Sequence, residues 1–103
     1  MKFLAKKEDI FNGIRLVANV AAMKSLQPVL ANILIETVDD NAVKLTATDF
    51  DLTISTTVDA KIENEGRITL PAKKLNDIVS RLSDKLITFE LNTETNSMNI
   101  TCD

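Results

Sequence analysis

The sequence predicts an α+β domain in which two helices pack on one face of an antiparallel sheet. Two segments carry apolar residues at the spacing of a single helical face, and the segments around them alternate apolar and polar residues as half-buried strands do. The order strand, helix, strand, strand occurs twice along the chain. Because each element must bury one side, these elements are expected to form one layered domain over residues 1–103.

The first repeat, about residues 1–60, is expected to begin with a strand over Met1–Ala5. A helix follows over Lys7–Asn19, where apolar residues recur at helical spacing. Ala21–Gln27 is expected to be a connection that Pro28 closes. Val29–Val38 is rich in branched apolar residues and is expected to form a largely buried strand.

The rest of this repeat is expected to be antiparallel. The short polar side chains of Asp39-Asp40-Asn41 suit a tight turn. Strands with a period of two are expected over Val43–Thr48 and Leu52–Val58. Asp59–Gly66 is the most polar stretch of the chain and is expected to be a loop between the two repeats.

The second repeat, about residues 61–103, is expected to begin with a strand over Arg67–Leu70. Pro71 suits the first turn of the helix that follows, where the N–H that proline lacks is not needed. Strands are then expected over Lys85–Leu91 and Ser97–Cys102, which raises the total to seven strands. The apolar face of the second helix is expected to consist of Leu75, Ile78, Val79 and Leu82.

The repeat is clearest in its hairpins. When Ile33–Thr48 is aligned with Thr88–Asp103, two polar turns fall in register. We expect the second repeat to lack its last strand, and therefore to leave a sheet edge open to pairing. The alignment places Val43, Leu45 and Ala47 over Met98, Ile100 and Cys102, and predicts that Cys102 is a small buried core residue.

The composition removes several classes of function. There is no histidine, so the commonest general base and the commonest zinc ligand are absent. Two glycines cannot supply a glycine-rich phosphate-binding loop. One cysteine, a charged N-terminal segment and the lack of an apolar run of about 20 residues predict a cytoplasmic protein without a membrane span. No catalytic residue and no cofactor are expected.

One metal site has to be weighed. Asp49 and Asp51 in the run TATDFDL could share one face of a strand and hold Mg²⁺. Aspartates beside a strand bend more often belong to turn chemistry, and no third carboxylate is obvious. A metal-dependent nuclease is therefore a weak alternative.

Charge is unevenly distributed along the chain, whose formal net charge is −3. Segments 8–24 and 71–85, the two expected helices with their exits, hold six basic and four acidic residues, whereas the remainder holds six basic and eleven acidic residues. Long cations on one helical layer suit contact with phosphates without reading bases. The sequence pattern alone favours the simpler interpretation, a solvated helix surface. The cations concerned are Arg15, Lys24, Lys73, Lys74 and Arg81.

Four segments in series carry a more specific signal: the opening MKF and the runs LQPVLANILIE, LTATDFDL and ITLPAKKLNDIVSRL. Together they resemble the N-terminal domain of the bacterial DNA polymerase III beta subunits, the beta sliding clamps, over essentially the whole chain. The resemblance implies the DNA-clamp fold, in which strand-helix-strand-strand-strand half-domains are duplicated. In that family three such domains make a subunit, and two subunits close into a ring with helices lining the hole.

The function that the resemblance implies is that of a processivity factor. The full-length ring encircles double-stranded DNA, tethers DNA polymerase III during replication, is placed by a clamp loader and performs no chemistry itself. The family's inward-facing basic residues match Arg15, Lys24, Lys73, Lys74 and Arg81, although Lys24 supplies a point charge where relatives commonly have the forked charge of arginine. Ile78 and Leu82 match positions near the subunit interface, and a core role is equally open for both.

Two further expectations concern the isolated chain. If its last strand is missing, it should be monomeric and should bind DNA weakly, because enclosure by the ring holds the family on DNA. The alternative from another class is a small α+β protein-interaction module that pairs through the open sheet edge.

Overall fold

The computed structural model of this chain describes residues 1–24, 32–48, 53–83 and 85–102, with only the backbone described at 19–24 and 48. All strand pairs among these residues are antiparallel. The two helices and the strands confirm the α+β class. In chain order the elements are β1 (Lys2–Lys6), α1 (Lys7–Lys24), β2 (Asn32–Val38), β3 (Ala42–Thr48), β4 (Thr53–Asp59), β5 (Lys61–Asn64), β6 (Arg67–Pro71), α2 (Ala72–Arg81), β7 (Leu86–Asn92) and β8 (Ser97–Cys102).

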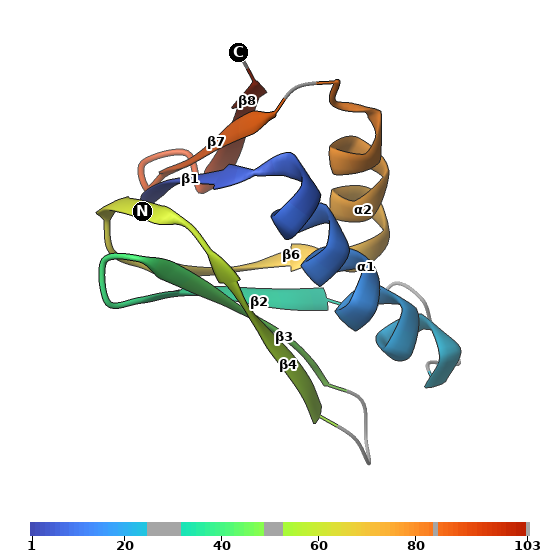
Figure 1. Cartoon of the computed structure of the whole chain (residues 1–103). Helices are drawn as coiled ribbons and strands as arrows, with labels where there is room; N and C mark the ends of the chain where they lie inside the picture. Colours follow the sequence, from blue (N-terminus) through green and yellow to red (C-terminus); the bar gives the residue numbers. More distant parts are fainter. Residues whose placement is uncertain (25–31, 49–52, 84, 103) are drawn as a thin grey trace.

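The strands of the described residues form two four-stranded sheets, where a single sheet was expected. One sheet has the order β5-β1-β7-β8 and the other has the order β4-β3-β2-β6. The cause is an exchange of strands between the repeats: β1 pairs with β7 of the second repeat, and β6 pairs with β2 of the first. The two repeats are therefore interlocked, and Figure 1 shows one sheet above the other with both helices on the same side of the molecule.

The core lies between the two sheets and beneath the helices. Phe3 of β1 and Phe89 of β7 are directly paired and fully buried, and their rings stack with centroids 4.7 Å apart and an angle of 11° between planes. Aliphatic side chains from the other sheet, including Ile35 and Leu45, complete this core. Around this aromatic pair the core is largely aliphatic.

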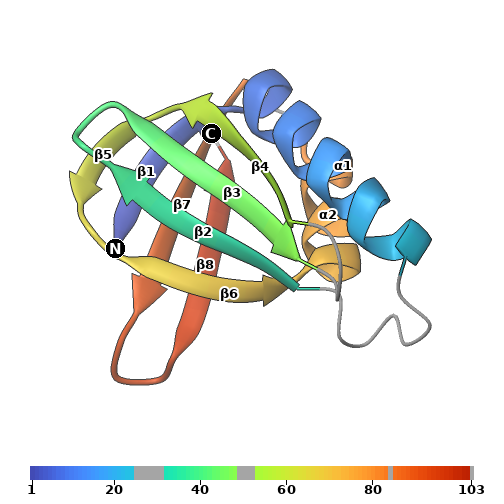
Figure 2. The same ribbon diagram turned by 90° about the horizontal axis from the view of Figure 1, so that it is seen from below.

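Helix α1 packs closely on β3 and β4 because it has a glycine at the crossing point. A Cβ atom added to Gly13 would lie 2.7 Å from Cγ2 of Val58 and 3.0 Å from Cδ1 of Leu45. The neighbouring residues Ile10 and Ile14 are fully buried, so this stripe of the helix faces the sheet. Figure 2 shows α1 and α2 side by side along the edge of the molecule. Neither of these helices has both the length and the apolar composition that crossing a membrane requires.

Three expected boundaries need correction. The segment Asp59–Gly66 is not simply a loop, because it contains β5, so the described residues hold eight strands and not seven. Ile62 pairs with Phe3, and the ion pair between Lys2 and Glu63 spans 3.4 Å. This pairing with β1 joins segments that are distant in the sequence. The sequence of the segment gives almost no sign of it, because the segment has so few apolar residues.

The helices also differ from the expectation at their ends. Helix α1 continues to Lys24, past the expected end at Asn19, because the alanine-rich residues after Asn19 favour a helix. Pro71 is the last residue of β6 and the N-cap of α2, with φ −61° and ψ 126°, and so precedes the first helical turn. Its extended backbone turns the chain from the sheet into the helix.

The duplicated hairpins confirm the expected alignment in their second strands only. Three residues, 39–41, connect β2 to β3, whereas four residues, 93–96, connect β7 to β8. The extra residue shifts the first strand of the second hairpin by one position, so Ile87 and Phe89 are the buried residues in place of Thr88 and Glu90. Cys102 is exposed, because β8 lies at an edge of its sheet within the described residues; the prediction of a buried cysteine is wrong.

Candidate nucleic-acid interface

The outward surface of the helix pair carries the described cations that the sequence singled out. Helix α2 turns its apolar stripe, which includes Leu75 and Val79, into the core. Its opposite side faces solvent, and Lys73, Lys74 and Arg81 are all exposed there. Helix α1 packs against α2 and exposes Arg15. All four side chains are thus exposed on two helices that contact each other, and their common role in binding stays a prediction.

Arg15 has the best-defined geometry of the set. Its guanidinium carbon lies 5.6 Å from the centroid of the Phe11 ring, one helical turn earlier, which is within the range of a cation–π contact. One guanidinium nitrogen, Nη2, also lies 3.5 Å from Oδ1 of Asn12 and donates a long hydrogen bond to it. These two contacts hold the cation against the helix and leave donors free for a ligand.

The cations of α2 divide into two groups. Lys73, Asp77 and Arg81 are spaced four residues apart and so occupy one row of the helix, with the carboxylate between the two cations. Lys74 belongs to another row and lines a shallow groove of about 250 Å³ together with Ile78 and Ile100. The sequence pattern did not separate these groups, because both rows are exposed.

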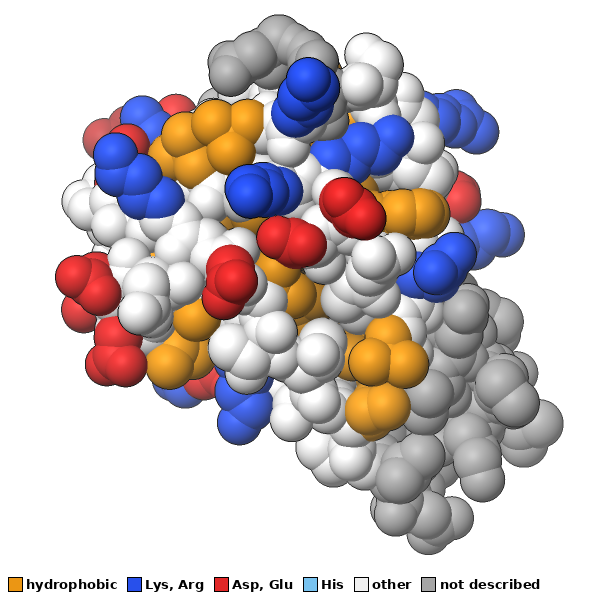
Figure 3. Space-filling model, viewed as in Figure 1, with side chains coloured by type: hydrophobic (Ala, Val, Ile, Leu, Met, Phe, Trp, Pro, Cys, Tyr) orange, Lys and Arg blue, Asp and Glu red, His pale blue; other side chains and the backbone are white. Residues whose placement is uncertain are grey.

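None of the four described cations is held by a carboxylate. Within residues 1–24, 32–48, 53–83 and 85–102, the structure has an ion pair between Lys2 of β1 and Glu63 of β5, and it involves neither helix. Unpaired cations on a common surface are available to neutralise phosphates. Figure 3 shows that Lys and Arg side chains gather in the upper part of the face drawn in Figure 1, with Asp and Glu side chains beneath them.

Lys24 requires a correction. It was expected in the loop after the first helix, but it is the last residue of α1. Its side chain lies outside the described part of the structure, so the structure does not relate it to the other cations. The pair Asp49 and Asp51, the alternative magnesium site, also lies outside the described residues.

The two expected interface residues occupy different environments. Ile78 is 39% exposed on α2 and lines the groove beside β8. Leu82 follows the last residue of α2 and packs against the core, and its backbone N–H donates to the carbonyl oxygen of Val79 at 3.2 Å. Ile78 therefore exposes apolar surface to solvent, whereas much of Leu82 packs in the fold.

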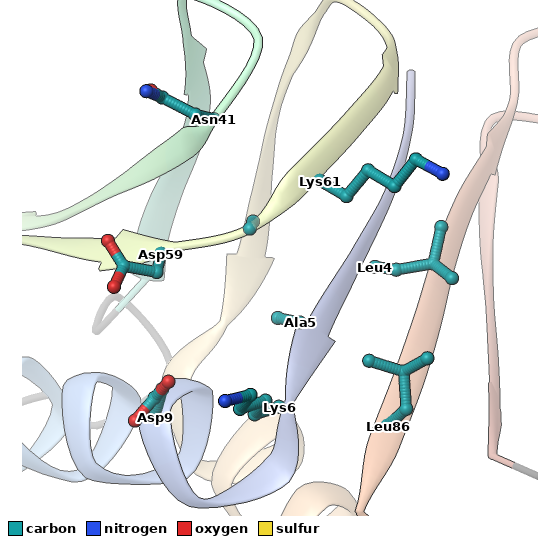
Figure 4. Close-up of a pocket in the computed structure, with 9 residues that line it drawn as sticks. Leu4, Ala5, Lys6, Asp9, Asn41, Asp59, Lys61 and Leu86 are labelled. Atoms are coloured by element: carbon teal, nitrogen blue, oxygen red, sulfur yellow. The ribbon is translucent and has the colours of Figure 1, made fainter.

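A second hollow, of about 470 Å³, lies between the two sheets near the start of α1. Figure 4 shows Leu4 and Leu86 on one side of it and the carboxylates of Asp9 and Asp59 on the other, with Lys6 below. Charges of both signs and apolar walls give no arrangement of nucleophile and base. Among the described residues, no three of His, Cys, Asp and Glu lie together as a metal site requires.

Phe11 is the residue whose role the sequence did not reveal. It is one of the apolar residues at helical spacing over Lys7–Asn19, but it is only partly buried and the Arg15 guanidinium lies over its ring. The spacing of four residues between Phe11 and Arg15 is the signal that could have indicated this pair.

Interlocked repeats, two adjacent helices and unpaired cations on the helices define a domain of the sliding-clamp class. The chain belongs to the family of the DNA polymerase III beta subunit, N-terminal domain, whose model matches residues 1–103. This agrees with the resemblance noted in the sequence.

Individual relatives support the same assignment. The chain is 44% identical over 92 residues to the beta sliding clamp of Synechocystis sp. and 40% identical over 94 residues to that of Synechococcus elongatus, which covers 88% and 89% of this chain. The crystal structure of the DNA polymerase sliding clamp from Caulobacter crescentus superposes with a TM-score of 0.86 at 27% identity and covers 98% of this chain. The chain spans only about a quarter of these relatives, 24%, 25% and 27% of their lengths.

Proposed function

We propose that this chain forms the N-terminal part of a ring that encircles duplex DNA and acts as a processivity factor for a replicative DNA polymerase. It contributes phosphate contacts and a subunit edge, and it performs no chemistry itself. The family match supports the role, and the observation that carries the DNA contact is the set of unpaired, exposed cations on the helix pair.

The cations suit contact that does not depend on base sequence. Arg15 lies on Phe11, while Lys73 and Arg81 flank Asp77 on α2. Each side chain reaches into solvent and offers donors to a phosphate, and none is paired with an acid among the described residues. Such contacts position a duplex without reading base edges. Lys74 is exposed and, among the described residues, unpaired in the same way and shares this role, whereas we extend the role to Lys24 from the resemblance alone.

The remaining parts of the proposal concern partners and location. In a complete ring the groove with Ile78, and to a lesser degree Leu82, would contact a second subunit of the same kind. A DNA polymerase III and a clamp loader would act on the ring in the bacterial cytoplasm. The isolated chain would bind duplex DNA weakly, because a small set of exposed contacts replaces enclosure.

A hybrid ring tests this proposal. In the hybrid, this chain replaces the matching N-terminal part of the Synechocystis clamp, to which it is 44% identical. Loaded by the Synechocystis clamp loader on nicked circular DNA, the hybrid ring should stay bound and should leave when the DNA is cut to a linear form. A hybrid that assembles as a dimer but is not retained on circular DNA would contradict the proposal.

Charge variants of the hybrid ring test the helix surface. Arg15→Gln combined with Arg81→Gln should shorten the sliding lifetime on circular DNA and reduce its dependence on salt. Lys44→Gln combined with Arg67→Gln is a matched control, because both residues are exposed on the sheet β4-β3-β2-β6. Equal effects of the two pairs would show that only overall charge matters.

The interaction-module alternative rests on one observation, the position of β8 at a sheet edge within the described residues. It predicts that the isolated chain forms a stable dimer through that edge. Sedimentation equilibrium of the chain alone distinguishes the two proposals, since the clamp proposal predicts a monomer.

A further inference from the structure

A hollow of about 700 Å³ opens where β1 passes into α1 and the chain leaves α2. Three lysines line it: Lys6 and Lys7 at the junction, and Lys85 just before β7. The backbone N–H of Lys7 donates to the carbonyl oxygen of Lys85 at 2.9 Å. Two lysines that are far apart in the sequence are therefore fixed beside each other by the backbone.

The walls of this lysine hollow are largely apolar. Phe11 and Leu86 line it, and Ser83 adds a hydroxyl group. Lysine stems can lie along such walls while their ammonium groups reach the opening. Sites for small organic ligands are commonly about 300–1,000 Å³, so the hollow is wide enough for a nucleotide-sized segment and is not limited to a single ion.

Among the described residues that line the lysine hollow, positive charge predominates. Glu8 is the carboxylate among its described lining residues, against three ammonium groups. None of the three lysines has an ion-pair partner among the described residues. Asp9 lines the neighbouring hollow of Figure 4, which shares Lys6 and Leu86 with this one. This excess of positive charge favours the binding of an anion. It disfavours a cation and also a peptide that carries charges of both signs.

The lysine hollow is continuous with the proposed DNA-contact surface. Phe11 lines the hollow and also lies beneath the Arg15 guanidinium at 5.6 Å. One aromatic ring thus joins Arg15 to the lysines at the start of α1. The upper part of Figure 3, where Lys and Arg side chains gather, includes the region where β1 passes into α1.

We propose that the lysine hollow is a second phosphate-binding subsite, in which Lys7 and Lys85 receive the backbone of the same duplex that Arg15 contacts. This inference rests on the proposed function, because the ligand is the duplex. Ammonium groups are compact point charges, so they bind phosphates without a fixed direction and without reading sequence. The residues that the sequence predicted to contact DNA include neither Lys7 nor Lys85.

The test uses the whole chain in solution at low ionic strength. A short duplex of mixed sequence and, separately, inorganic pyrophosphate are titrated while amide resonances are followed by NMR. Both probes should shift the resonances of Lys7, Ser83 and Lys85. The variant Lys7→Gln with Lys85→Gln should weaken duplex binding by about tenfold and lower the slope of log affinity against log salt by about 2, since each phosphate contact contributes a slope of about 0.9.

The matched control again removes two exposed cations, by Lys44→Gln with Arg67→Gln, and should leave both quantities nearly unchanged. Equal losses in the two variants would overturn the subsite in favour of a general charge effect. Shifts confined to Arg15, Lys73, Lys74 and Arg81 would also overturn it and leave the proposed function standing. If the hybrid ring fails on circular DNA while Lys7 and Lys85 still respond to the duplex, the clamp role is lost and the phosphate subsite remains.

Discussion

Thr37 and Gly66 are joined by a reciprocal set of hydrogen bonds that fixes β2 to the start of β6. The backbone N–H of Thr37 donates to the carbonyl oxygen of Gly66 at 3.0 Å, and its hydroxyl donates to the same oxygen at 3.2 Å. The N–H of Gly66 in turn donates to Oγ1 of Thr37 at 3.0 Å. One threonine thus satisfies both backbone groups of a glycine at the point where the second repeat enters the sheet of the first.

Thr37→Val should lower the free energy of unfolding by about 1–2 kcal/mol, because the partly buried N–H of Gly66 loses its acceptor while the shape of the side chain is kept. Urea unfolding followed by circular dichroism measures the change. Thr57→Val, at an exposed position of β4, is the control and should change the stability by less than about 0.5 kcal/mol. Similar losses in both variants would show that the hydroxyl of Thr37 contributes nothing specific.

Gly13→Ala should destabilise the protein even though alanine is the better helix former. The gain in helix propensity is about 1 kcal/mol, whereas overpacking a closely packed contact costs about 1–3 kcal/mol. The new Cβ would lie 2.7 Å from Cγ2 of Val58, which is closer than side-chain carbon atoms tolerate. We therefore expect a net loss of about 1 kcal/mol in urea unfolding.

A double-mutant cycle checks the cause of that loss. In a Val58→Ala background the conflicting methyl group is gone, so Gly13→Ala should become neutral or stabilising. If Gly13→Ala costs the same in both backgrounds, the contact between these two residues is not the reason for the glycine.

The sequence predicts the local elements of this fold well and their pairing poorly. Both helices and most strands are set by short-range periodicity, and the turn at Asp39, with φ 54°, follows from the side chains that tolerate this conformation. The exchange of β1 and β6 between the sheets depends on contacts between distant segments. Strand β5 has Ile62 as its one partly buried strand residue, so its pairing with β1 could not be inferred from alternation.

The candidate site, too, can be predicted from the sequence only in part. Exposure of Lys73, Lys74 and Arg81 follows from the apolar stripe of α2, which the periodicity identifies. The approach of Lys7 to Lys85 depends on how the start of α1 meets β7, and no pattern within either segment indicates it. Helical periodicity places residues on a face, but only the tertiary fold brings two such faces together.

Asn76→Leu should raise the stability of the chain by about 1 kcal/mol. Oδ1 of Asn76 is buried and accepts no hydrogen bond among the described residues, and an unsatisfied buried polar group costs about 1–3 kcal/mol. Leucine is also a better helix former than asparagine. Thermal and urea unfolding measure the gain. Asn76→Asp should have the opposite effect, because it places a charge at the same position, and a loss of stability in Asn76→Leu would mean that solvent satisfies the oxygen.

Ile78→Gln and Leu82→Ala should separate a subunit contact from a core contact. In the isolated chain, Ile78→Gln should change the stability by less than about 1 kcal/mol, because Ile78 is 39% exposed. Leu82→Ala should lower it by about 1–2 kcal/mol, which is less than the 2–5 kcal/mol of fully buried leucines, because Leu82 is partly buried against the core. Urea unfolding of both variants gives the two values.

In the hybrid ring, Ile78→Gln should impair dimer assembly more than Leu82→Ala does, which is the reverse of their order for stability. If Ile78 is a hot spot at the centre of this interface, its truncation costs about 2 kcal/mol or more, so Ile78→Gln should raise the dimer dissociation constant at least about tenfold in sedimentation equilibrium. Val38→Gln is the matched control, because Val38 is another exposed apolar residue, 36% exposed at the far end of β2. If Ile78→Gln leaves the dimer as stable as Val38→Gln does, the groove beside β8 is not the place where the second subunit binds.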